Sequence, residues 1–105
     1  MHWSLSLDMF DIRKENKVET FKDMRFTDKE KMGAIYRDIV SKFDSYTIEF
    51  NDLEHKDKFI RLDTCQVVDS DDPKDLMADF SSEHYFDVSC KKEIESYFEE
   101  KRASL

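Results

Sequence analysis

The chain has 105 residues, with 25 Asp and Glu against 17 Lys and Arg, so its formal net charge is −8 at pH 7. Such a surface repels nucleic acid and anionic membranes, because affinity for phosphate comes from Lys and Arg. Nine Phe, four Tyr and one Trp supply enough apolar area for a core, although 40% of the residues are charged. The length fits one domain, which we expect to span residues 1–105.

The scarce residue types exclude several classes of protein. With Gly33 and Pro73 as its only glycine and proline, the chain cannot form a glycine-rich phosphate-binding loop. Cys65 and Cys90 do not make a disulfide framework. The first residues lack the pattern of a signal peptide, and no apolar stretch has transmembrane length. We therefore expect a cytoplasmic protein that does not enter membranes.

The first two predicted elements form a hairpin. Apolar and polar residues alternate from Trp3 to Met9, the period of two that is typical of a half-buried strand. The polar segment 13–17 predicts a turn. Residues 18–26 predict a second strand, although their alternation is poor.

A helix follows the hairpin. Thr27 and Glu30 are spaced as in a capping box, in which each side chain satisfies a free backbone amide. Apolar residues at helical spacing then predict one buried face. They are Met32, Ile35, Tyr36, Ile39, Val40 and Phe43.

Two further strands are predicted around a polar loop at 51–56. Residues 46–50 alternate as a strand does, and residues 59–68 form a longer apolar run. In that run the alternation changes phase between Leu62 and Cys65. A β-bulge near Asp63 and Thr64 would explain the change, and a strand buried on both faces is the alternative.

The last third predicts two helices with a short strand at 84–88 between them. Asp72, Pro73 and Asp75 are typical of a helix start. Ser89 would cap the final helix. The inward residues would be Leu76, Met77 and Phe80 in the first helix, and Cys90, Ile94, Tyr97 and Phe98 in the second. Paired strands with helices between them predict an α+β fold: a mainly antiparallel sheet with about three helices packed on it.

Acidic residues concentrate between positions 69 and 87, with seven acids against one lysine, whereas residues 1–68 hold fourteen acids and twelve bases. Clustered like charges destabilise a fold slightly, so the cluster favours a binding role. Helix caps and a solvated helix face are the alternative explanation. We predict a partner-binding surface with Tyr85 as an aromatic anchor. Its residues are Asp69, Asp71, Asp72, Asp75, Asp79, Glu83, Tyr85 and Asp87.

The same segment fails the tests for a metal site. An EF-hand loop that starts at Asp69 would need Gly and Glu where Lys74 and Phe80 stand. A phosphatase that uses Asp69 and Asp71 would need a larger, doubly wound domain. We therefore predict no metal and no cofactor.

No catalytic set is visible either. His2, His55 and His84 are far apart, and neither cysteine has a ligand partner at metal-site spacing. Cys65 and Cys90 fall on predicted apolar faces, which favours core packing. The alternative for Cys90 is an activated thiol near a helix N-terminus. We predict that the chain has no catalytic residues and is not an enzyme.

A small acidic chain without a catalytic set is typical of proteins that occupy a basic site. We expect a binding inhibitor of a basic effector protein, in the manner of an immunity protein or antitoxin against a nuclease toxin, because acidity increases association rate and specificity. One alternative is a phage-type DNA mimic, an anti-CRISPR or anti-restriction inhibitor, whose surface Glu49, Asp52 and Glu54 would extend. Others are a small enzyme or metal protein that uses Asp69 and Asp71, and a structural or adaptor domain. The hypothesis of a binding inhibitor predicts a basic protein partner and no direct contact with nucleic acid.

Overall fold

The computed structural model describes residues 2–13, 18–67 and 82–105. Within these ranges the chain forms four strands, two α-helices and three short 3₁₀ helices (η). Their bounds in chain order are β1 His2–Asp11, β2 Val18–Phe26, α1 Lys29–Lys42, η1 Asp44–Tyr46, η2 Phe50–His55, β3 Lys58–Val67, β4 Glu83–Phe86, η4 Val88–Cys90 and α2 Lys91–Ala103. Among the described residues, no helix combines the length and the apolar composition that a membrane span requires.

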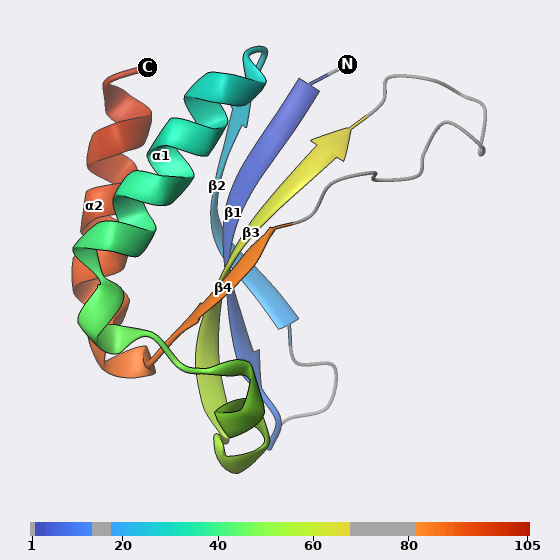
Figure 1. The fold of residues 1–105 in the computed structure, drawn as a ribbon, viewed down its shortest axis with the longest axis vertical. Helices are drawn as coiled ribbons and strands as arrows, with labels where there is room; N and C mark the ends of the chain where they lie inside the picture. The colour runs from blue at the N-terminus through green and yellow to red at the C-terminus, as the bar shows by residue number, and fades with distance from the viewer. Residues whose placement is uncertain (1, 14–17, 68–81) are drawn as a thin grey trace.

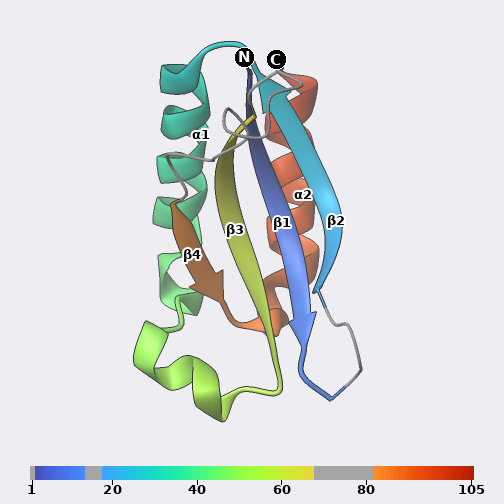
Figure 2. The same ribbon diagram turned by 90° about the vertical axis from the view of Figure 1, so that its right-hand side faces the viewer.

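The four strands form one antiparallel sheet in the order β2-β1-β3-β4. Both α-helices cover the same face of the sheet (Figure 1). The opposite face carries no α-helix among the described residues (Figure 2), and we call it the helix-free face. The predicted α+β fold with a mainly antiparallel sheet is confirmed. The helix predicted to start near Asp72 lies outside the described residues.

The core lies between the sheet and the helices, because alternate side chains of each strand point toward α1 and α2. The fully buried side chains are Leu5, Leu7, Ile39, Ile60, Leu62, Phe86, Cys90, Ile94 and Phe98. The inward faces predicted for α1 and α2 are therefore confirmed, whereas Leu76, Met77 and Phe80 lie outside the described residues.

The start of each helix differs from the prediction by one or two residues. Asp28, and not Thr27, caps α1: its carboxylate accepts a hydrogen bond from the Glu30 amide at 2.9 Å. Asp87, and not Ser89, caps the turn before α2, where it accepts from the Ser89 amide at 3.0 Å. In both places a carboxylate, which makes the stronger charge-assisted bond, takes the capping role next to a hydroxyl residue.

The strand predicted at 46–50 is wrong. Only Thr47 forms a bridge, with Phe86 of the short edge strand β4, and η1 and η2 flank it. Backbone bonds from Ile48 to Tyr85 and from Asp87 to Tyr46, each 2.8 Å long, hold this segment against β4. Ile48 packs inward, but Phe50 turns outward, so the alternation that suggested a strand does not mark one buried face.

The bulge predicted in β3 is also wrong. β1 and β3 pair without a break from His2 opposite Val67 to Asp11 opposite Lys58. Thr64 occupies a buried, inward position, where its hydroxyl oxygen accepts a bond from the Ser82 amide at 2.8 Å. The apparent phase change thus reflects a polar residue that is satisfied inside. The register shift lies in the β1–β2 pair instead, which explains the poor alternation of β2.

Candidate functional site

Strand pairing arranges the helix-free face into parallel rows of cross-strand neighbours, of which three hold its rings and acidic side chains and a fourth holds Arg25, Ser4 and Cys65. The apolar row consists of Val18, Phe10 and Phe59; the middle row of Thr20, Asp8, Arg61 and Tyr85; and the acidic row of Asp23, Ser6, Asp63 and Glu83. Each row takes one residue from each strand that it crosses, and neighbours within a row lie about 4.5–5.5 Å apart at Cβ.

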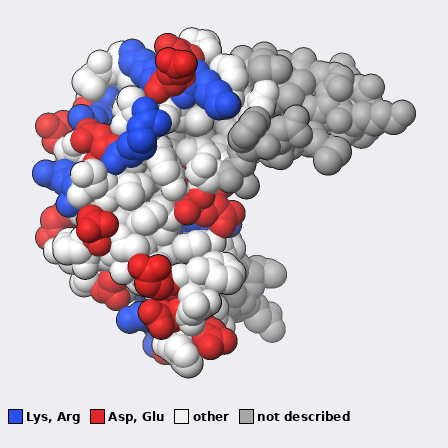
Figure 3. Space-filling model, viewed as in Figure 1, with Lys and Arg blue, Asp and Glu red and all other residues white. Residues whose placement is uncertain are grey.

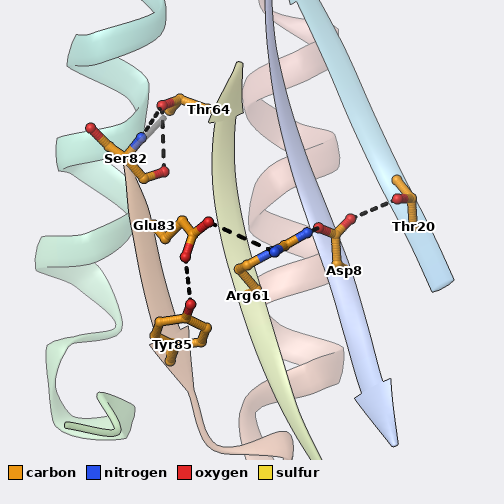
Figure 4. Close-up of polar contacts among 7 residues, drawn as sticks. All are labelled: Asp8, Thr20, Arg61, Thr64, Ser82, Glu83 and Tyr85. Atoms are coloured by element: carbon orange, nitrogen blue, oxygen red, sulfur yellow. Dashed lines mark hydrogen bonds and ion pairs between the residues drawn. The ribbon is translucent and has the colours of Figure 1, made fainter. Parts of the chain in front are cut away.

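In the middle row, hydrogen bonds join the ion pair of Asp8 and Arg61 to Thr20 across three strands (Figure 4). Arg61 donates from Nε and Nη2 to Oδ2 of Asp8, at 3.0 and 2.7 Å. The Thr20 hydroxyl donates to Oδ1 of the same carboxylate at 2.6 Å. Asp8 is only 2% exposed, so these bonds replace the water that its charge would otherwise hold.

Arg61 is the cation at the centre of the face. Burial alone would lower its pKa, but the hydrogen bond and the charge of Asp8 outweigh burial and raise the pKa. The guanidinium carbon lies 4.8 Å from the centre of the Phe10 ring, and Nη1 lies 3.8 Å from Oε1 of Glu83. One guanidinium therefore contacts two carboxylates and an aromatic ring.

The acidic row contains no Lys or Arg. Asp63 of β3 lies directly opposite Glu83 of β4, a like-charge pair that destabilises an antiparallel sheet. Oδ1 of Asp63 is buried and has no hydrogen-bond partner among the described residues. Burial raises the pKa of Asp63, and the charges of Asp8 and Glu83 add to the rise while Arg61 opposes it.

Aromatic rings lie beside these charges. Phe10 and Phe59 stack with their centres 4.9 Å apart, and Tyr85 meets Phe59 edge-on at 5.6 Å. The Tyr85 hydroxyl donates to Oε2 of Glu83 at 2.5 Å. Burial and this bond raise the pKa of Tyr85 to about 12, so the phenol stays protonated. Val18, at the β2 end of the apolar row, is 51% exposed.

The predicted partner-binding residues fall into three groups. Asp69, Asp71, Asp72, Asp75 and Asp79 lie outside the described residues. Glu83 and Tyr85 lie together on the helix-free face and are bonded to each other. Asp87 lies beyond β4, where its bond to Ser89 lowers its pKa and Lys56 approaches it at 3.9 Å. The structure therefore brings two of the eight predicted residues onto one face.

Sequence reasoning missed Asp8, Asp23, Arg61 and Asp63. The signal was present, because Asp8 alternates with Leu7 and Met9, and Arg61 and Asp63 alternate with Ile60 and Leu62. Each charge therefore had to face away from the core. Their meeting in rows depends on strand order, which the sequence did not show.

An open cleft of about 580 Å³ lies beside β4, between the η1–η2 segment and η4. Next to it, Nε2 of His84 shares a hydrogen bond with the Thr47 hydroxyl at 2.9 Å. Burial lowers the pKa of His84, against the charges of Asp44 and Glu49. The ring thus serves as a neutral link between β4 and the segment beside it.

Cys90 is buried just before α2. Burial raises the pKa of Cys90 to about 11, so the thiol stays protonated and the activated-thiol reading is wrong. Among the described residues, no three His, Cys, Asp or Glu side chains are placed to hold a metal ion.

These features define an α+β protein with two helices on one face of its sheet and an acidic, aromatic face opposite. No protein-family model, curated protein or solved structure matches the chain.

Proposed function

We propose that the chain is a binding protein that neutralises a basic partner protein, and that the helix-free face is its contact surface. The acidic row carries the proposal, because Asp23, Asp63 and Glu83 lie along one row of the helix-free face and the row itself contains no base. A basic surface would remove the mutual repulsion of these carboxylates, and opposite charges would speed the encounter.

Several side chains of the face are also held by hydrogen bonds, which favours tight binding. Hydrogen bonds across β2, β1 and β3 hold Asp8 and Arg61 in place, and the Tyr85–Glu83 bond orients the carboxylate at the β4 edge. Groups that are already ordered lose little conformational freedom when a partner docks. The half-buried rings of Phe10 and Tyr85 supply the apolar contact that interface anchors provide.

Acidic side chains also gather at the end of the molecule where η1 and η2 lie (Figure 3). The exposed acids of this segment are Asp44, Glu49, Asp52 and Glu54. They would add to long-range attraction without touching the same part of the partner. A nuclease toxin is the most specific partner that we propose, because a nuclease must be basic where it holds phosphate.

The test is affinity capture of the tagged chain from its native cells, first at low and then at moderate salt, with mass spectrometry of the bound proteins. We expect one basic protein at near one-to-one ratio, released as salt rises. Asp63→Lys with Glu83→Lys should abolish capture, and the matched reversal of Asp52 and Glu54 in η2 should weaken it only slightly. A partner held equally by both reversed forms would remove the helix-free face from the proposal.

Competition with duplex DNA distinguishes a DNA mimic from an inhibitor of the immunity-protein type. If the chain mimics DNA, excess duplex should displace it from the captured partner, because both would occupy one groove. Displacement by salt but not by duplex favours a partner surface other than the nucleic-acid groove, as an immunity protein that binds beside the active site would use.

A further inference from the structure

The Asp63–Glu83 end of the acidic row has the composition of a receptor for one more guanidinium group. Glu83 is exposed, and Asp63 and Tyr85 are half-buried, so an approaching side chain can reach this corner of the sheet. The two arginines of the face do not fill it. Arg61 is bonded to Asp8 and reaches Oε1 of Glu83 only at 3.8 Å, and Arg25 lies on β2 at the opposite edge of the sheet.

Arg61 shows how this surface holds a guanidinium. Its group lies over the Phe10 ring, donates two hydrogen bonds to Asp8 and approaches Glu83. A planar group with five donors suits this combination of ring and carboxylates, whereas an ammonium lacks the flat face and the fork of donors. The same ingredients recur one row further along, with Tyr85 as the ring and Asp63 and Glu83 as the carboxylates.

The charges at the corner formed by Asp63, Glu83 and Tyr85 favour the binding of an added cation. Asp63 and Glu83 repel each other, and Oδ1 of the half-buried Asp63 has no hydrogen-bond partner among the described residues. Arg61 lies too far from Glu83, at 3.8 Å, to make a short hydrogen bond. An added guanidinium can lie between the two carboxylates and stack on the phenol ring, which gains both Coulomb and cation–π attraction.

We infer that the corner formed by Asp63, Glu83 and Tyr85 receives an arginine side chain of the partner. The inference deepens the proposed function and rests on it, because it names the partner's anchor: an arginine that projects from a basic surface. A partner that presented lysine instead would gain the charge attraction but lose the stacking and the forked bonds.

The test uses blocked triarginine as the probe, with trilysine and tricitrulline as matched peptides, and carbon-detected NMR of the carboxyl groups. Triarginine should shift the Asp63 and Glu83 carboxyl signals and the Tyr85 ring signals more than those of Asp52 and Glu54. Trilysine should bind about tenfold more weakly, and tricitrulline, which has the shape of arginine without its charge, should cause no shift.

Variants keep the test independent of folding. Glu83→Gln changes one exposed group and should weaken triarginine binding without a change in the amide spectrum elsewhere. Tyr85→Leu should weaken triarginine more than trilysine, because both cations are attracted to the ring but only the planar guanidinium also stacks on it. Asp52→Asn with Glu54→Gln is the matched control and should bind as the natural chain does. Equal shifts at all surface acids, or equal affinity for triarginine and trilysine, would overturn the inference.

The result of this test can be distinguished from the result of the test of the proposed function. Selective triarginine binding together with no captured partner would leave the arginine corner standing and remove the inhibitor role. A captured basic partner that is indifferent to Glu83→Gln and Tyr85→Leu would keep the binding role and remove this corner as its anchor.

Discussion

The two faces of the sheet use alternate residues of the same strands in opposite ways. On the covered face, Leu7 and Leu62 lie opposite each other and are fully buried under the helices. One residue further along each strand, Asp8 and Arg61 lie opposite each other on the helix-free face and are bonded. The first face stabilises the fold through apolar burial. The second face instead holds bonded charges and aromatic rings.

The largest expected difference between the faces is in stability. Phe98 of α2 is fully buried against the covered face, so Phe98→Ala should lower the free energy of unfolding by about 3–5 kcal/mol. Val18→Ala on the helix-free face should change it by only about 0.5 kcal/mol. Urea unfolding followed by circular dichroism measures both. Similar losses would mean that the helix-free face is covered in solution.

The second largest effect concerns Asp8, which is 2% exposed on the helix-free face. Asp8→Ala removes three hydrogen bonds and leaves Arg61 without its partner, so we expect a loss of about 2–3 kcal/mol. Asp23→Ala, an exposed acid on the same face, is the control and should cost at most about 0.5 kcal/mol. A double-mutant cycle with Arg61→Ala isolates the coupling. A coupling near zero would show that the pair does not help to hold β1 and β3 together.

The elements that could be predicted are those in which one buried face extends over several helical turns or over several residue pairs between strands. The apolar spacing of α1 and α2 and the alternation of β1 report burial directly, so these elements and the α+β class followed from sequence. The segment 46–50 misled because its alternation of Tyr46, Ile48 and Phe50 is that of a strand, yet Phe50 is 76% exposed. The alternation arose from two inward residues, Tyr46 and Ile48, that are followed by a turn.

The rows of the helix-free face could not be predicted, since they depend on register. Thr20 is 12 residues from Asp8 in the chain, and Arg61 is 53 residues from it, yet both contact the same carboxylate. The prediction relied on charge density along the chain, which found Glu83 and Tyr85. It could not find Asp8 and Asp63, whose importance comes from neighbours on other strands.

The two cysteines offer a chemical comparison of the faces. Cys90 is fully buried and its pKa is raised to about 11, whereas Cys65 of β3 is half-buried on the helix-free side. At neutral pH a thiol reagent should modify Cys65 in the folded chain and reach Cys90 only when the chain unfolds. Mass mapping after short labelling measures the order, with Cys65→Ser as control. Fast modification of Cys90 would show that the helices open readily.

The smallest expected effect comes from the Tyr85 hydroxyl, and it tests whether the edge of the acidic row is ordered. Burial and Glu83 raise the Tyr85 pKa from 10.0 to about 12, so between these pH values the folded chain keeps a proton that the unfolded chain loses. Stability must therefore fall as pH rises through this range. Tyr85→Phe should flatten that fall while changing stability at neutral pH by less than about 1 kcal/mol.

Urea unfolding at several pH values, with tyrosinate absorbance recorded in parallel, measures both effects. Glu83→Gln is the matched control, because it removes the negative charge but leaves a side chain that can still accept a hydrogen bond. This variant should lower the Tyr85 pKa part of the way back toward 10.0. If both variants follow the pH dependence of the natural chain, Tyr85 is free in solution and the contrast between the faces is weaker at β4. If both flatten it, the carboxylate and the ring are in contact in the folded chain.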